Sequence, residues 1–396
     1  MIGRDFRRLL WATGIDNLGT GAFTAAVPLL TVTVTHDPRL VSLVSAAAYL
    51  PWLLLSLPAG ALADRHDRAG LMWRAQAVQA VLVAVTAVLA ACDAIGIPVL
   101  AAMAFGIGAG EVVFGTAAQA ILPDLVAKPL LPRANGRQQA ITTVAEQFAG
   151  PPLGSLLFGV AAALPFGLDA VSFAVSAVLV RTLPRRARGA RTRGAVRDGL
   201  AWLLRHRLLR TLAMLVGVNT FCGQLAAATL VLLATQVVHL DARGFGLLLA
   251  GAALGSVLGG LVNARVVARI GSRAALLMAL AANVAAFAGV GLSRDAEVLG
   301  AFLAVNGFVT TLWNIVTVGL RQELVPPALL GRVSSAYRLL GWGLIPVGSL
   351  AGGLVAHELG LRAPYLVAAV VRGLALVAAL PVLLSPLWTE TGQRRV

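Results

Sequence analysis

Residues 40–74 read LVSLVSAAAYLPWLLLSLPAGALADRHDRAGLMWR, in which an apolar run ends in a short charged stretch and a second apolar run follows. The run at 40–63 is long enough to cross a bilayer as a helix, which needs about 20 mostly apolar residues. A helix satisfies its own backbone hydrogen bonds and can therefore span hydrocarbon. The stretch predicts two membrane-spanning helices joined by a short charged loop.

Twelve apolar spans of this kind divide the chain. We place them at 9–34, 40–63, 71–92, 97–122, 138–163, 165–183, 211–238, 245–264, 274–292, 298–320, 333–357 and 364–388. Hydrophobic residues make up 58% of the 396 residues and charged residues 12%, and the mean hydropathy is +0.85. These values lie outside the range of soluble globular proteins. The sequence therefore predicts an all-α integral membrane protein with twelve transmembrane helices.

Arg and Lys fall almost entirely in every second loop between the spans. The loops on the side of both termini hold 27 of the 32 basic residues. Because basic loops are retained in the cytoplasm, both termini are expected to be cytoplasmic. The same distribution accounts for the net charge of +15, so we expect no nucleic-acid partner. A single Lys among the basic residues is typical of GC-rich codon usage, which favours a bacterial cell membrane.

Three short motifs occur twice, at equivalent places in the two halves of the chain. The pairs are Gly60–Asp64 with Gly259–Asn263, Gln119–Pro123 with Gln322–Pro326, and Pro152–Ser155 with Pro346–Ser349. Three matches in the same order indicate two parallel six-helix repeats. We expect an N-terminal six-helix bundle at 1–183, a basic cytoplasmic hinge at 184–206 and a C-terminal six-helix bundle at 207–396.

The hinge contains a short amphipathic segment. Its apolar residues, which include Leu200, Leu203 and Leu204, share one side of a helix, and Arg197 and Arg205 lie elsewhere around it. This pattern predicts a helix in the headgroup layer with its basic side towards anionic lipid. A basic retention signal without fixed structure is the alternative.

Polar side chains recur on one face of four spans, the first and fourth of each half. Such groups need a partner or a water-filled cavity inside the membrane, so the stripes indicate a shared polar cavity. Any single Thr or Asn among them is also suited to hydrogen bonding between helices. The residues that we expect to bind substrate or protons are Asp16, Asn17, Thr20, Glu111, Glu146, Asn219, Gln224, Asn306 and Asn314.

Glu111 and Glu146 stand apart because a carboxylate inside the membrane is costly. Such a group can bind a proton or a cationic substrate, and competition between the two is enough for exchange. If several aromatic residues near the same spans face the cavity, it suits a lipophilic or amphipathic solute. Arg372 lies within the last span, on a helix that we expect to be peripheral, and we assign it no role.

Motifs for nucleotide hydrolysis, metal binding and covalent catalysis do not occur in the sequence. It contains no G-x-x-x-x-G-K-[ST], and its sole Lys is Lys128. The five His residues lie in separate loops, and Cys92 and Cys222 fall in or beside spans. Neither a metal cluster nor a disulfide framework is therefore expected. We expect a protein that is not an enzyme and that uses no cofactor.

The loop between the second and third spans resembles the signature loop of the major facilitator superfamily. It reads Gly60-Ala61-Leu62-Ala63-Asp64-Arg65-His66-Asp67-Arg68. With the twelve spans and the repeat, the resemblance covers nearly the whole chain. It implies that Gly60, Asp64, Arg65 and Arg68 form a latch that closes the cytoplasmic side against the eleventh helix. A carboxylate at the positive end of a helix dipole is favourable there.

Finer marks are similar to the branch that includes macrolide-efflux and enterobactin-export proteins. They are Ala134-Asn135-Gly136, the hinge stretch from Asp198 to His206, and Gly331-Arg332-Val333 leading to Pro346-Val347-Gly348. Gly150, Pro151 and Gly154 resemble the fifth-helix motif of antiporters, with Ser155 in place of its last Gly. The fourth-helix Arg of many proton-coupled antiporters is absent, which leaves the coupling ion open.

The resemblance implies a secondary active exporter that works by alternating access, with proton antiport as the expected coupling. The substrate would be a small lipophilic or amphipathic compound, such as a drug, a secondary metabolite or a siderophore. We expect a monomer whose partners are this solute, protons and anionic lipids. An importer of a small nutrient is the alternative, and a membrane-embedded enzyme or assembly factor is the alternative from another class.

Overall fold

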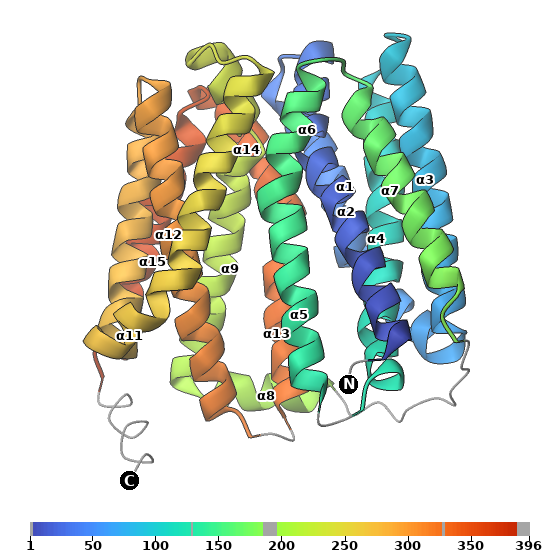
Figure 1. Cartoon of the computed structure of the whole chain (residues 1–396). Helices are drawn as coiled ribbons and strands as arrows, with labels where there is room; N and C mark the ends of the chain where they lie inside the picture. Colours follow the sequence, from blue (N-terminus) through green and yellow to red (C-terminus); the bar gives the residue numbers. More distant parts are fainter. Residues whose placement is uncertain (1–2, 128–129, 185–195, 327–328, 386–396) are drawn as a thin grey trace. The chain divides into compact units, whose positions relative to one another are not determined.

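The computed structural model describes residues 3–127, 130–184, 196–326 and 329–385, and all regular secondary structure in these ranges is helical (Figure 1). The first half forms α1 Arg4–Val34, α2 Pro38–Arg65, α3 Arg68–Ala91, α4 Ile97–Leu125, α5 Leu131–Thr142, the π-helix η2 Thr143–Ala149, α6 Gly150–Phe158 and α7 Leu164–Arg181. The second half forms α8 Val196–Arg205, α9 Arg207–Ala227, α10 Leu230–Leu232, the π-helix η3 Leu233–Val237, α11 Ala242–Leu292, α12 Ala296–Leu324, α13 Leu330–Gly343, α14 Ile345–Leu359 and α15 Ala363–Leu383. The all-α prediction is confirmed.

Ten helical stretches among the described residues are long and apolar enough to cross a membrane. One of them, α11, covers two of the expected spans. Gly271 lies between these two runs in a non-helical conformation, with φ 80° and ψ 157°. Glycine adopts a positive φ without the steric cost that a Cβ would impose. The expected span at 138–163 is divided among α5, η2 and α6, because a π-helical segment interrupts the α-helix.

The helices pack into two compact units. The N-terminal unit comprises residues 1–192 and 239–250, and the C-terminal unit comprises 193–238 and 251–396. In the N-terminal unit α1 packs on α6 and α7, α2 packs on α4, and α3 packs on both α4 and α7. In the C-terminal unit α9 packs on α14 and α15, and α8 packs on α13. The bundle boundaries that the sequence suggests stay a prediction.

The duplicated Pro-x-Gly-Ser motif makes an equivalent helix contact in each unit. A Cβ on Gly154 of α6 would collide with the backbone of Ala22 on α1. A Cβ on Gly348 of α14 would equally collide with the backbone of Phe221 on α9. Small residues of this kind let membrane helices approach closely. The motif therefore serves helix packing in both units.

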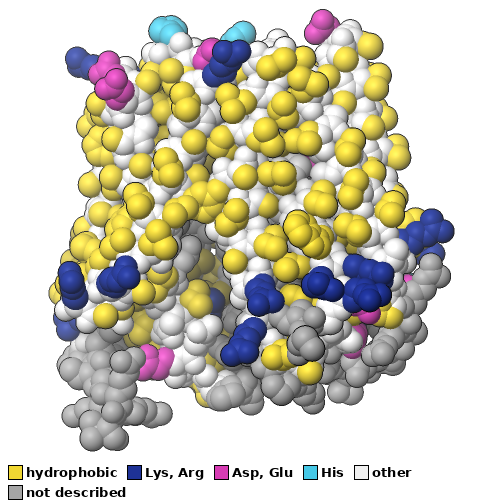
Figure 2. All heavy atoms as spheres, in the orientation of Figure 1, with side chains coloured by type: hydrophobic (Ala, Val, Ile, Leu, Met, Phe, Trp, Pro, Cys, Tyr) yellow, Lys and Arg dark blue, Asp and Glu magenta, His cyan; other side chains and the backbone are white. Residues whose placement is uncertain are grey.

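Apolar side chains fill the inside of each unit and also cover its outside. Phe6 and Met72 are fully buried in the N-terminal unit, as are Leu212 and Leu276 in the C-terminal unit. Other large apolar side chains, such as Leu254 at 62% exposure, point outwards. Figure 2 shows hydrophobic side chains along the middle of the helices and charged side chains towards their ends. Such an outer surface suits contact with lipid rather than water.

Candidate functional site

The C-terminal unit contains a cavity of about 540 Å³. Its walls come from α9, the second part of α11, α12, α13, α14 and α15. The polar residues that line it are Asn219, Thr220, Gln224, Asn283, Asn306, Thr310, Asn314 and Arg372, and the aromatic residues are Phe287, Trp313, Trp342 and Tyr365. A cavity of roughly 300–1,000 Å³ with an apolar wall and a few polar groups is typical of small-molecule sites.

Four of the residues that the sequence analysis singled out meet at this cavity. Asn219 and Gln224 reach it from α9, and Asn306 and Asn314 reach it from α12. The helical spacing of the polar stripes therefore identified the correct faces of these two helices. Their role in binding a solute stays a prediction.

Arg372, to which the sequence analysis assigned no role, also lines the cavity. The α15 helix packs on α9, and only 7% of the Arg372 side chain is exposed. Nη2 of Arg372 donates to the carbonyl oxygen of Asn219 over 2.8 Å, and Nη1 donates to Oδ1 of Asn283. Asn283 in turn donates through Nδ2 to Oδ1 of Asn306 over 3.0 Å.

An aromatic ring completes the surroundings of Arg372. Its guanidinium carbon lies 3.8 Å from the centre of the Phe287 ring. A cation in this position is attracted by the negative face of the ring. The guanidinium group is thus held from α9, α11 and α15 at once. The signal that could have found it is the position itself, because an Arg inside an apolar span almost always faces the protein interior.

The N-terminal unit holds a group of buried carboxyl side chains. Asp16 of α1 is 1% exposed and accepts a hydrogen bond from Nε2 of Gln76 over 2.8 Å. Asp169 of α7 is fully buried and accepts from the Ser172 hydroxyl over 3.2 Å. A Cβ on Gly19 would collide with Asp169 and Ser172, so α1 and α7 approach each other closely here.

These two carboxyl groups lie near Glu111 and Glu146. Asp16 interacts electrostatically with Glu111, Asp169 and Glu146. No ion pair joins any of the four to a basic residue in the described part of the chain. The structure thus gathers the three predicted carboxylates and adds Asp169, which the sequence analysis missed. The acidic residue inside the span at 165–183 was the signal.

Two further predicted site residues, Asn17 and Thr20, lie on α1. Asn17 donates through Nδ2 to the carbonyl oxygen of Thr13 over 2.6 Å, one turn earlier in the same helix. The Thr20 hydroxyl is buried and makes no hydrogen bond within the described residues. In α6, Gly150 and Gly154 lie directly against the backbone of α1. Pro151 occupies the first turn of α6, where a missing backbone N–H is tolerated.

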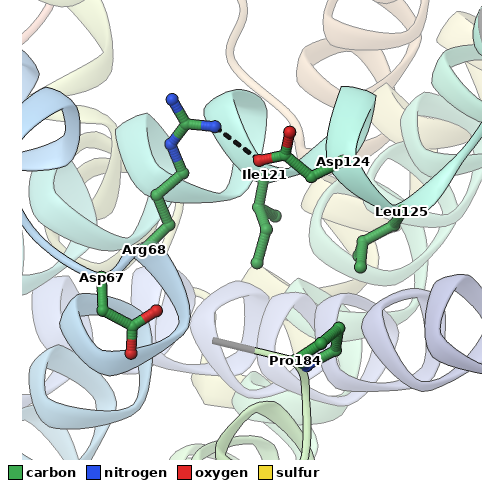
Figure 3. A pocket seen from close by; sticks show the side chains of 6 residues that line it. All are labelled: Asp67, Arg68, Ile121, Asp124, Leu125 and Pro184. Atoms are coloured by element: carbon green, nitrogen blue, oxygen red, sulfur yellow. Dashed lines mark hydrogen bonds and ion pairs between the residues drawn. The ribbon is translucent and has the colours of Figure 1, made fainter. Parts of the chain in front are cut away.

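Of the predicted latch residues, Arg68 makes an ion pair with a carboxylate of α4, and the latch itself stays a prediction. Arg68 donates through Nη1 to Asp124 of α4, and Figure 3 shows the two side chains facing each other. Asp67 caps α3 by accepting from the backbone N–H of Gly70 over 3.0 Å. Arg65 is exposed and a Cβ on Gly60 would meet open space. The side chain of Asp64 lies outside the described residues.

Comparisons with known proteins agree with this architecture. The family described as transmembrane secretion effector matches residues 3–392. The multidrug efflux pump Tap of Mycolicibacterium fortuitum is 26% identical over 378 residues, which is 90% of each chain.

Solved structures with this fold are also transporters. A bacterial homologue of the iron transporter ferroportin, in its inward-facing state, has a TM-score of 0.74 and 17% identity over 95% of this chain and 98% of that chain. A mutant of the nucleoside transporter NupG has a TM-score of 0.72 and 14% identity over the same shares of the two chains. At these identities the likeness shows the fold alone. By its family match over nearly the whole length, the chain belongs to the transmembrane secretion effector family of the major facilitator superfamily, and it is a multi-pass membrane transporter.

Proposed function

We propose that this protein exports a small amphipathic or lipophilic compound across a bacterial cell membrane by alternating access. The observation that carries the proposal is the cavity of the C-terminal unit. Its wall combines aromatic side chains, among them Trp313 and Trp342, with carboxamides such as Asn306 and Asn314. Apolar and polar contacts in one cavity suit a solute that has both kinds of surface. The similarity to the efflux pump Tap supports the outward direction.

The proposed topology has twelve spans with both termini in the cytoplasm. It counts α11 as two spans on either side of Gly271 and counts residues 131–158 as one further span. The basic residues of alternate loops support the orientation. A reporter inserted beside His66 should be cytoplasmic and one inserted beside Asp295 should be extracytoplasmic. The opposite result at either site would overturn this topology.

The proposed energy source is proton antiport through the carboxyl groups of the N-terminal unit. Asp16 and Asp169 are fully enclosed, and Glu111 and Glu146 are close to them. Neighbouring carboxyl groups inside the membrane, with no ion pair to a basic residue among the described residues, are suited to holding and releasing protons. Conformational changes of this unit during transport would alter the exposure of these carboxyl groups. Proton binding and release would thereby be coupled to movement of the solute.

We propose one partner besides the solute and protons, the membrane lipid, and we place its contact at α8. Leu203 of this helix is buried among residues of the C-terminal unit, whereas Leu204 is exposed. An amphipathic helix with basic residues at the membrane boundary is suited to contact with anionic lipid headgroups. We propose that the transporter works as a monomer with α8 in the headgroup layer.

Expression in an efflux-deficient bacterial host tests the function. Cells that express the protein should tolerate higher concentrations of some amphipathic compounds and accumulate less of them after preloading. Collapse of the proton gradient by an uncoupler should abolish the difference. Accumulation that rises on expression would indicate an importer. Unchanged tolerance and unchanged accumulation across a broad compound panel would contradict export of such compounds.

A further inference from the structure

The cavity of the C-terminal unit contains a positive charge that has no negative partner among the residues that the structure describes. Arg372 donates to an amide oxygen and to a backbone carbonyl oxygen, and both acceptors are neutral. Its buried Nε–H has no acceptor at all among the described residues. Among the described residues, no Asp or Glu belongs to the cavity lining. The titratable group that interacts with it is the Cys222 thiol.

An enclosed cation of this kind is costly, because a charge removed from water loses its hydration. Packing alone does not require it, since an apolar side chain of similar size would fill the same space without that loss. The structure nevertheless keeps the guanidinium group in a fixed position. Phe287 covers one face at 3.8 Å, and the hydrogen bond between Asn283 and Asn306 fixes the acceptor of Nη1. The charge is therefore in place before any solute arrives.

The other lining residues restrict the shape and polarity of an anionic solute. Trp313, Trp342 and Tyr365 offer flat apolar surfaces, and Asn219 and Asn314 offer amide groups. Guanidinium groups bind carboxylates and similar oxyanions through charge and directed N–H groups. Flat aromatic walls favour a planar apolar body.

We propose that this cavity selects amphipathic organic monoanions, with the anionic group neutralised by Arg372 and a planar apolar body against the aromatic wall. The inference rests on the proposed function, because it names the class of solute that the exporter would carry. One negative charge matches Arg372, the one basic residue among the described lining residues.

A purely structural role for Arg372 is the competing explanation. The side chain ties α9, α11 and α15 together, so its removal should lower stability under either explanation. Only a binding role makes the protein distinguish an anion from a neutral compound of the same shape. The ratio of the two affinities is therefore the informative quantity.

The experiment uses the full-length protein, purified in detergent, and two probes of one shape. 2-Naphthoate carries the anionic group and 2-naphthamide is its neutral counterpart. Binding is followed by quenching of tryptophan fluorescence, because Trp313 and Trp342 line the cavity. Protein-free micelles correct for partition of the probes. The wild type should bind 2-naphthoate at least about tenfold more tightly than 2-naphthamide, which corresponds to about 1.4 kcal/mol.

Variants then locate the preference. Arg372→Gln should reduce the affinity for 2-naphthoate about tenfold and change that for 2-naphthamide less than about twofold. Arg372→Lys, which keeps the charge but loses the guanidinium shape, should retain part of the preference. Arg265→Gln is the matched control, because Arg265 is exposed and lies outside the cavity lining. It should behave as the wild type.

Two results would overturn the inference. One is equal affinity of the wild type for both probes, which needs no variant to be stable. The other is an unchanged affinity ratio in folded Arg372→Gln. The export assay in cells is independent of this outcome. If the protein prefers the anion but exports nothing, the proposed function is contradicted and the proposed anion site stands. If it exports compounds without any anion preference, the proposed function stands and the anion site is contradicted.

Discussion

Arg68 at the start of α3 and Asp124 at the end of α4 form an ion pair of 2.7 Å between Nη1 and Oδ2. Only 12% and 7% of the two side chains are exposed. The same Nη1 also donates to the carbonyl oxygen of Ala120 over 2.8 Å. The loop that resembles a latch is therefore anchored within the N-terminal unit by a carboxylate of α4.

Asp124→Asn should destabilise the protein, because it removes the one negative partner that the partly buried Arg68 has among the described residues. A hydrogen bond to a charged group contributes about 2 kcal/mol. We expect a melting temperature several degrees lower, measured on the protein purified in detergent. Asp5→Asn is the control, since Asp5 pairs with Arg8 across 3.4 Å on the exposed side of α1. Exposed pairs contribute about 0–1 kcal/mol. Equal decreases in melting temperature for the two variants would show that the buried ion pair contributes no more to stability than the exposed one.

Gly154→Ala should impair packing of α6 on α1. Its new Cβ would collide with the Ala22 backbone, which cannot move aside as a flexible side chain could. The variant should give less folded protein and a lower melting temperature. Gly260→Ala is matched to it, because a Cβ there meets nothing within 4 Å. In a helix that exchange favours folding by about 0.5–1 kcal/mol. A stable Gly154→Ala protein would mean that α1 and α6 are not in close contact.

The sequence could predict the helices and part of the cavity because both depend on local pattern. Apolar length defines the spans, and helical spacing placed Asn219, Gln224, Asn306 and Asn314 on shared faces. Each of these residues belongs to a stripe of polar groups on its own helix. Such a stripe is visible without knowledge of the neighbouring helices.

Residues that act alone on their helices were harder to place. Arg372 and Asn283 lie on spans with few polar residues, so periodicity assigned them no face. Their roles depend on contacts between residues 89 positions apart in the chain. The contacts of Asp169 and Asp124 likewise come from other helices, since Asp169 lies against α1 and Asp124 pairs with Arg68 of α3. Spacing along one helix carries no information about which other helix it meets.

The junction between α8 and α9 should respond to pH through His206. Partial burial lowers the pKa of His206 below its usual value of 6.5, and its Nδ1 accepts from the backbone N–H of Leu209 over 3.3 Å. The unfolded chain therefore binds a proton more readily than the folded one. The contribution of His206 to stability is complete above about pH 6.5 and falls as the pH drops below that value.

His206→Asn should remove this pH dependence, because Asn also caps helices but does not titrate. We expect the melting temperature of the wild type to fall more between pH 7.5 and pH 5 than that of the variant. His36→Asn, at an exposed position, serves as the control and should follow the wild type. Parallel pH profiles for wild type and His206→Asn would exclude His206 as the responsible group.

Proton coupling should depend on the enclosed carboxyl groups of the N-terminal unit. Asp16→Asn and Glu111→Gln each imitate the protonated form with almost no change in volume. If these groups carry the proton, proteoliposomes with either variant should still bind an exported compound but fail to concentrate it when a pH gradient is imposed. Substrate-induced proton release should decrease in parallel. Glu358→Gln is the matched control, because the Glu358 side chain is 73% exposed. Gradient-driven transport at the wild-type rate by both Asp16→Asn and Glu111→Gln would leave Asp169 and Glu146 as the remaining carriers. If single variants of all four residues transport at the wild-type rate, none of these four carboxyl groups is required for proton coupling.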